Sequence, residues 1–210
     1  LQFAPGGGIL VGDTANHRIR KLADVGQVHD PELVRSIGVT PVDGIVQVKP
    51  NARPAFIALR ERDLTPNASD IDATAGTLDI AVRNRTGQLD TAQVSRGGFR
   101  ITQPPAGVVI SELKLTDRLD GCRGTTRITA HGATPLRSVR RLRVRVKGRF
   151  RTVGRYASAI ARGTAWTMTD TCDRTIIRVT EGTVVVRNLR TRRVLTVRAG
   201  QRRMILARSR

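Results

Sequence analysis

Aromatic residues are scarce in this 210-residue chain, at 3% of the sequence, with one tryptophan, one tyrosine and four phenylalanines. A hydrophobic core must therefore be built mainly from aliphatic side chains, and the strand-favouring residues Val, Ile and Thr are abundant. Long apolar runs are also lacking. None approaches the roughly 18 residues that a membrane-spanning helix needs, so we expect no membrane-spanning segment in this sequence.

Histidine and cysteine are scarce as well. The three histidines, His17, His29 and His131, lie far apart, and the two cysteines, Cys122 and Cys172, form no CxxC pair. A metal site needs three or four convergent ligands, and no such spacing occurs. Neither a GxSxG nucleophile motif nor a phosphate-binding GxxxxGK[ST] loop is present. We therefore expect no catalytic residues, no metal and no cofactor, and hence a protein that is not an enzyme.

The two cysteines admit two interpretations, a disulfide or a pair of buried free thiols. An even number of cysteines in a β-rich chain favours the disulfide Cys122–Cys172. Its 50-residue loop would contribute about 4 kcal/mol in the chain-entropy model.

Lysine is rare, since only four of the 37 basic residues are Lys, a skew typical of a GC-rich bacterial genome. The charge is also uneven. Residues 1–120 carry 14 basic and 14 acidic residues, whereas residues 121–210 carry 23 basic and three acidic residues. The whole net charge of +20 therefore lies in the last 90 residues. Such asymmetry indicates contact with a polyanion such as a wall polymer, an acidic lipid or nucleic acid.

A basic stretch around residues 140–155 holds the candidate polyanion contacts, which are Arg141, Arg143, Arg145, Lys147, Arg149 and Arg151. The alternative interpretation is a solvated, arginine-rich strand face with no ligand. Phe150 is the only aromatic residue inside the basic run, whereas binders of RNA and single strands interleave several aromatics for base stacking. The sequence therefore disfavours a nucleic-acid partner.

Short alternating apolar runs recur along the chain, separated by turn residues roughly every 8–12 positions, and no stretch predicts an amphipathic helix. This pattern predicts an all-β fold, an antiparallel sandwich or roll. Trp166 is expected on a short strand, filling the core, because one large aromatic in an aromatic-poor core has much area to bury.

Residues 12–21, GDTANHRIRK, resemble the core of an NHL repeat, the motif of a β-propeller blade. We expect a partial NHL repeat at residues 8–22, a two-stranded blade remnant that occupies a domain of residues 1–22. One blade cannot bury its own faces, and the chain begins at Leu1 in mid-pattern. We therefore expect that the other blades lie upstream in a longer protein or are absent. Residues 23–43 are expected to form a linker, with the domain boundary near Pro41.

Residues 44–206 resemble a FecR-like domain. The resemblance is carried by GIVQV at 44–48, DIDATAGTL at 70–78, GGFRITQ at 97–103, ARGTAW at 161–166, TEGTVVVR at 180–187 and VRAGQ at 197–201. It implies an all-β, extracytoplasmic, non-catalytic module over residues 44–210.

These features predict a non-enzymatic, extracytoplasmic structural or interaction module of a larger bacterial surface or secreted protein. Its basic C-terminal half would dock on an anionic envelope polymer, or the module would bind a protein partner. The alternative is an envelope signalling module, a sensor that resembles an anti-sigma regulator and acts through a protein partner.

Overall fold

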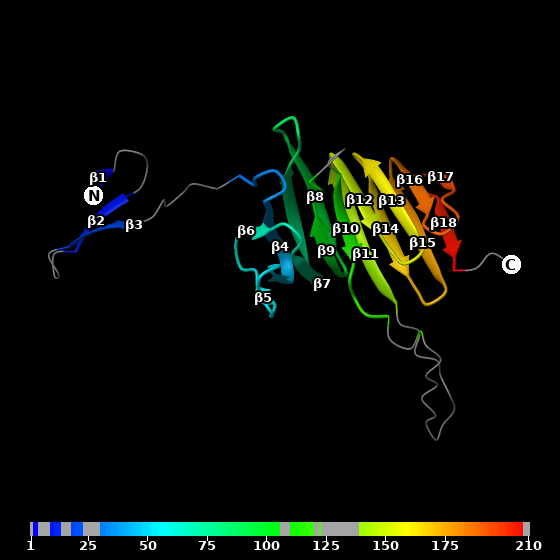
Figure 1. Cartoon of the computed structure of the whole chain (residues 1–210), viewed down its shortest axis with the longest axis horizontal. Coiled ribbons are helices and arrows are strands. Elements are labelled where there is room, and N and C mark those ends of the chain that lie inside the picture. The colour runs from blue at the N-terminus through cyan, green and yellow to red at the C-terminus, as the bar shows by residue number, and fades with distance from the viewer. Residues whose placement is uncertain are drawn as a thin grey trace, which may run out of the picture. The chain divides into compact units, whose positions relative to one another are not determined.

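The computed structural model describes residues 30–105, 110–119, 122 and 139–207, and the backbone of residues 2–3, 9–13 and 18–22. The chain divides into two compact units, Leu1–Asp30 and Pro31–Arg210 (Figure 1). The described residues contain strands and turns and no helix. Accordingly, the described residues include no helix that is long and apolar enough to cross a membrane.

The first unit contains a three-stranded antiparallel sheet in the order β1 (Gln2–Phe3), β2 (Ile9–Asp13) and β3 (Arg18–Leu22). The register between the two longer strands pairs Ile9 with Leu22 and Asp13 with Arg18. The sequence predicted two strands here, and β1 adds a third. Strands of this length are compatible with many β folds, so the NHL resemblance stays a prediction.

The second unit is a single sheet of 15 strands, almost all of them antiparallel. The strands are β4 (Ser36–Lys49), β5 (Ile57–Ala58), β6 (Asp63–Pro66), β7 (Asp70–Arg83), β8 (Leu89–Ser95), β9 (Gly98–Thr102), β10 (Ser111–Leu115), β11 (Arg140–Lys147), β12 (Arg149–Val153), β13 (Ala157–Arg162), β14 (Ala165–Asp170), β15 (Arg174–Glu181), β16 (Thr183–Asn188), β17 (Val194–Arg198) and β18 (Arg202–Leu206). The predicted all-β class is confirmed.

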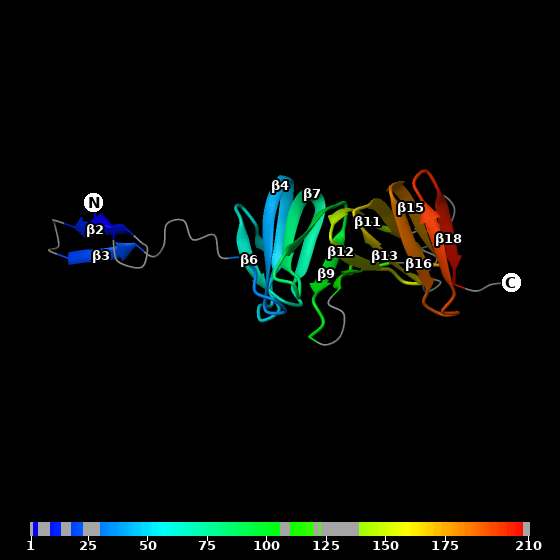
Figure 2. The ribbon, with the colours of Figure 1, turned by 90° about the horizontal axis from the view of Figure 1, so that it is seen from above.

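The sheet folds over into two layers that enclose one core (Figures 1 and 2). Layer A has the strand order β8-β11-β14-β15-β18, and layer B has the order β9-β10-β12-β13-β16-β17. The long strand β7 joins the layers, because its first residues pair with β9 and its last residues pair with β8. The other long strand, β4, pairs with β7 along most of its length.

The chain changes layer repeatedly after β11, and short corners make these changes possible. From β15 in layer A it passes through Gly182 into β16 in layer B. Gly182 has a φ of 68°, and a Cβ added there would lie 2.6 Å from Cγ2 of Thr164. Glycine fits this corner because it adopts positive φ at no steric cost and leaves room for the neighbouring corner.

Alternating side chains fill the core between the layers. Leu142, Val144 and Val146 of β11 are buried, and so is Phe150 of β12, while the residues between the three β11 positions are exposed. Trp166 is fully buried, as the sequence predicted, and its indole N–H donates to Oγ1 of Thr152 at 3.0 Å. The hydrogen bond satisfies the one polar group of this large side chain, which otherwise contributes apolar area.

The boundary expected near Pro41 is not where the structure places it. The second unit begins at Pro31, and β4 runs through Pro41, with Ile37 and Val39 fully buried in the core. Proline is a boundary signal because it removes a ladder hydrogen bond. Here β4 accommodates it with a register shift between Pro41 and Asp43, a bulge that lets the strand continue.

Candidate anion-binding face

Strand β11 presents a row of basic side chains on the outer face of layer A. Arg141, Arg143, Arg145 and Lys147 are exposed, while the intervening residues are buried. This alternation follows from the two-residue period of a strand, which sends successive side chains to opposite faces. The solvated, arginine-rich strand face that the sequence suggested for this stretch is therefore present.

Neighbouring strands of layer A add arginines that are distant in sequence. Arg143 pairs with Thr167 of β14, Thr167 pairs with Arg178 of β15, and Arg178 pairs with Arg202 of β18. Directly opposed residues of antiparallel strands point to the same face. The register thus forms one row, Arg143–Thr167–Arg178–Arg202, across four strands.

Arg96 lines the same face from the short connection between β8 and β9. Its φ is 71°, a left-handed conformation that costs a residue with a Cβ about 1–2 kcal/mol. The next residue, Gly97, lies against the backbone of β11, since an added Cβ would lie 1.9 Å from the carbonyl oxygen of Arg141. Only glycine permits this close approach, and the approach brings Arg96 beside Arg141.

These side chains surround an open depression of about 510 Å³, which we call the arginine hollow. Its lining consists of five arginines, three threonines and one isoleucine, namely Arg96, Arg141, Arg143, Arg178, Arg202, Thr167, Thr169, Thr180 and Ile176. The lining contains no acidic and no aromatic residue.

The five guanidinium groups of the hollow have no ion-pair partner within the described part of the chain. Two of them, Arg178 and Arg202, stand directly opposite each other on neighbouring strands. Like charges in this position repel each other and destabilise the sheet. The hollow is therefore a concentrated positive site that no carboxylate of the described residues compensates.

The structure divides the six basic residues that the sequence singled out. Arg141 and Arg143 line the hollow, whereas Arg145 forms an ion pair with Glu181. Lys147 lies further along β11, beside a second, smaller depression.

The remaining two predicted residues, Arg149 and Arg151, lie on β12 in layer B. Arg149 stands opposite Arg162 of β13, and Arg151 is paired with Glu112 at 2.6 Å. The six residues are consecutive in the alternating sequence, but they do not form one surface, because the chain changes layer between β11 and β12.

Sequence reasoning missed Arg96, Arg178 and Arg202 as members of this face. Arg178 carries a local signal, since it alternates with buried Ile177 and Val179, but alternation alone does not reveal the neighbouring strand. The strand pairing in the order β8-β11-β14-β15-β18 decides which arginines meet.

Layer B shows the opposite arrangement around a carboxylate. Asp70 is mostly buried and is held by Arg100 at 2.7 Å and by Lys49 at 3.0 Å. The hydrogen bonds from Arg100, aided by Lys49, lower the pKa of the Asp70 carboxyl below its usual value and outweigh the opposing effect of burial. Asp72, two residues on, accepts a hydrogen bond from the N–H of Thr74, so the two carboxylates have separate partners.

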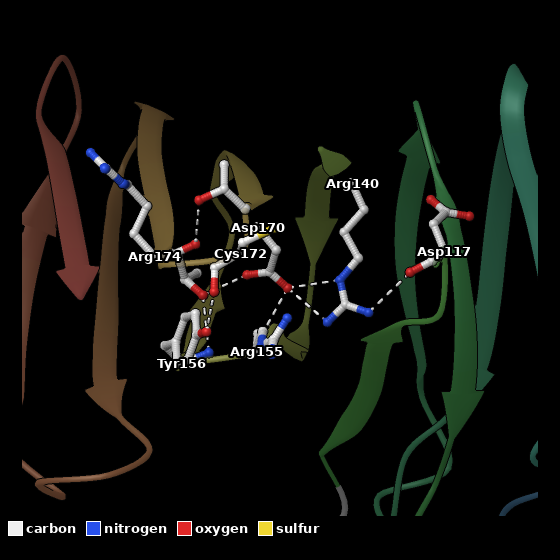
Figure 3. A network of polar contacts seen from close by, with 9 residues as sticks. Asp117, Arg140, Arg155, Tyr156, Asp170, Cys172 and Arg174 are labelled. Atoms are coloured by element: carbon white, nitrogen blue, oxygen red, sulfur yellow. Dashed lines mark hydrogen bonds and ion pairs between the residues drawn. The ribbon is translucent and has the colours of Figure 1, made fainter. Parts of the chain in front are cut away.

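A polar network surrounds Asp170 at the end of β14 (Figure 3). Asp170 is fully buried, and its carboxylate accepts hydrogen bonds from Nε of Arg140 at 2.9 Å and from the N–H of Arg155 at 2.8 Å. The hydroxyl of Thr175 donates to its other oxygen. Arg140 continues the network by donating to the carbonyl oxygen of Asp117 at 3.2 Å.

This network has a structural role. Every oxygen of Asp170 is occupied by a donor of the chain, which is how a folded protein tolerates a buried charge. Asp170 is thus a buried anchor that joins β11, β14 and β15. Asp173 is the exposed turn residue, where hydrogen bonds from Arg174 and from the hydroxyl of Thr171 lower the pKa of its carboxyl.

Cys122 and Cys172 lie at disulfide distance, with their sulfur atoms 2.19 Å apart, as the sequence predicted. Cys172 follows β14, and its carbonyl oxygen accepts a hydrogen bond from the hydroxyl of Tyr156. The disulfide thus joins residue 122 to the end of the sandwich that the Asp170 network stabilises.

No group of three or more His, Cys, Asp and Glu side chains that could hold a metal ion occurs among the residues that the structure describes. His17, His29 and His131 lie outside the described residues.

Comparison of the chain with protein-family models, with curated proteins and with solved structures found no match. The resemblances to FecR-like domains and NHL repeats therefore stay predictions.

Proposed function

We propose that this chain is a non-enzymatic, extracytoplasmic interaction module that docks on an anionic envelope polymer through the outer face of layer A. The observation that carries the proposal is the arginine hollow, where five guanidiniums converge without a carboxylate. A flexible anionic chain would supply the missing counter-charges. Many weak charge-assisted contacts along one strand of polymer would then add up to useful affinity.

Two further observations and one resemblance support the proposal. The disulfide Cys122–Cys172 is compatible with an oxidising, extracytoplasmic location. The net charge of +20 would accelerate encounter with a polyanion and make binding depend strongly on ionic strength. The resemblance to FecR-like domains implies the same kind of non-catalytic, extracytoplasmic module.

The test is a co-sedimentation assay of the whole chain with purified, insoluble cell-wall material over a series of salt concentrations. We expect binding at low salt that weakens steeply as salt rises, because bound counter-ions are released on docking and screening opposes the contact. The triple variant Arg143→Gln, Arg178→Gln and Arg202→Gln should bind at least about tenfold more weakly, since each lost charged hydrogen bond weakens the contact.

A matched control removes three exposed arginines from layer B, Arg162→Gln, Arg187→Gln and Arg198→Gln. Both triple variants lower the net charge equally, so a difference between them reports the hollow rather than the overall charge. Equal loss of binding in the two variants, or binding that salt does not affect, would overturn the proposal.

A further inference from the structure

The arginine hollow carries a more specific inference about the ligand, and this inference rests on the proposed function. All five charged residues of the lining are arginines. A guanidinium offers parallel N–H donors that match two oxygens of a phosphate or of a carboxylate, whereas lysine acts as a point charge. The arginines of the hollow come from several strands, so they suit the tetrahedral oxygens of a phosphate, which accept donors from several directions, better than the planar oxygens of a carboxylate.

The spacing of the arginines suits several anionic groups on one chain. Neighbouring strands lie about 4.8 Å apart, so the row from Arg143 to Arg202 spans about 14 Å. Along β11, Arg141 and Arg143 are two residues apart, or about 7 Å. A site of this extent would contact successive phosphates of a polymer, and its volume of about 510 Å³ lies in the usual range for ligand sites.

Threonines form the polar part of the lining. Thr167 lies between Arg143 and Arg178 in the row, and Thr169 pairs with Arg141. Their hydroxyl groups can donate hydrogen bonds to phosphate oxygens or accept them from polyol hydroxyls. The hollow thus offers both charge and neutral hydrogen bonding to a chain in which phosphates alternate with hydroxylated linkers.

Two features of the hollow raise the free energy of the folded chain when no ligand is bound. Arg178 faces Arg202 directly, and Arg96 occupies a backbone conformation that residues other than glycine avoid. Unfavourable backbone and charge arrangements concentrate at ligand sites, where a bound group offsets them. Both features involve lining residues of one depression, and a bound anion would offset the repulsion between Arg178 and Arg202.

The lining contains no aromatic side chain. Proteins that hold single-stranded nucleic acid combine a basic groove with aromatic rings on which the bases stack. A ligand without bases suits this hollow better. We propose that the arginine hollow binds the phosphodiester groups of a base-free polyol phosphate polymer.

The experiment compares three polymers of similar length and charge with the whole chain: poly(glycerol phosphate), polygalacturonate and oligo(dT). Binding is followed by fluorescence anisotropy of labelled polymers at about 0.1 M salt, where long-range attraction is partly screened. We expect poly(glycerol phosphate) to bind at least about tenfold more tightly than polygalacturonate, because a tetrahedral phosphate accepts guanidinium hydrogen bonds from more directions than a planar carboxylate does.

A charge-preserving variant isolates the guanidinium. Arg143→Lys, Arg178→Lys and Arg202→Lys together keep the net charge but remove the paired donors, so the preference for phosphate should fall to within about twofold. The control Arg162→Lys, Arg187→Lys and Arg198→Lys should keep the preference unchanged.

The possible failures are distinct. Equal binding of poly(glycerol phosphate) and polygalacturonate would overturn the phosphate inference and leave the proposed polyanion docking intact. Binding of neither polymer would overturn both. Oligo(dT) binding as tightly as poly(glycerol phosphate), or a preference for phosphate that survives in the hollow's lysine variant, would also overturn the inference.

Discussion

Arg140 and Arg141 are neighbours in β11, yet they lie in opposite surroundings. Arg140 turns inward and holds the fully buried carboxylate of Asp170, with its own side chain 16% exposed. Arg141 turns outward into the arginine hollow, which contains no carboxylate. The alternation of one strand therefore assigns one arginine to the stability of the fold and the next to a surface open to a ligand.

The same contrast holds between wider regions of the molecule. Arg100 and Arg151 of layer B each hold a carboxylate, that of Asp70 and that of Glu112. The hollow in layer A collects its arginines without any such partner. Net charge alone does not separate these groups. What separates them is whether a carboxylate lies on the neighbouring strand. Substitutions in the arginine–carboxylate pairs should therefore lower the free energy of unfolding, and substitutions in the hollow should not.

The largest effect is expected in the Asp170 network. Asp170→Asn places an amide among donors that need an acceptor, the guanidinium of Arg140 and the N–H of Arg155. Because the charge of Arg140 then loses its partner inside the protein, the free energy of unfolding should fall by about 3 kcal/mol. Urea-induced unfolding at neutral pH measures the change.

The control for this prediction is Asp173→Asn, three residues further on. Asp173 pairs with Arg174 at an exposed turn, so its loss should cost less than about 1 kcal/mol. A fall of less than 1 kcal/mol in Asp170→Asn would show that the network around Asp170 does not stabilise the sandwich as the geometry indicates.

A smaller, pH-dependent effect is expected at Asp70. Its pKa is lowered in the folded protein, chiefly by Arg100, so its ionised form stabilises the fold at neutral pH. This stabilisation is complete above the pKa of the unfolded chain, about 3.9, and is lost as the pH falls through the lower folded value. Asp70→Asn should therefore reduce the free energy of unfolding by about 1 kcal/mol at pH 7, because its partners are partly exposed.

Urea unfolding of the wild type and of Asp70→Asn at pH 7, 5, 3.5 and 2.5 checks this prediction. The difference between the two proteins should be constant between pH 7 and pH 5 and should shrink at the two lower values. Asp173 also titrates with a lowered pKa but is present in both proteins, so its contribution cancels. A difference that grew towards acid would contradict the direction of the Asp70 shift.

Much of the fold could be predicted from local patterns. The basic stretch around residues 140–155 was expected to present a strand face, and β11 lies there. The recurring turn residues predicted the short strands found along the second unit. Trp166 could be assigned to the core because it is the largest side chain in an aromatic-poor sequence. The start of the second unit could not be predicted, because proline at 41 normally ends a strand and the bulge that accommodates it depends on β7.

The candidate site was predictable only in part. Its first members, Arg141 and Arg143, lie in a visibly basic alternating segment. Arg178 and Arg202 join them through the registers of β14, β15 and β18, which a single sequence does not reveal. Arg149 and Arg151 were assigned to the same surface because the sequence does not show that the chain changes layer after Lys147.

The smallest change in the free energy of unfolding is expected in the arginine hollow itself. Arg178→Gln removes the charge that faces Arg202 while keeping part of the aliphatic stem. Relief of the opposed like charges should raise the free energy of unfolding by about 0.3 kcal/mol, and the gain should be larger at low salt, where screening is weak. Arg187→Gln is the control, since Arg187 faces Ser158 and Val194 and has no charged neighbour across either strand.

A loss of more than about 1 kcal/mol in Arg178→Gln would place this arginine with Arg140 among the residues that stabilise the fold. An unchanged or raised stability, together with weakened polymer binding, is the combination expected of a residue that serves the ligand.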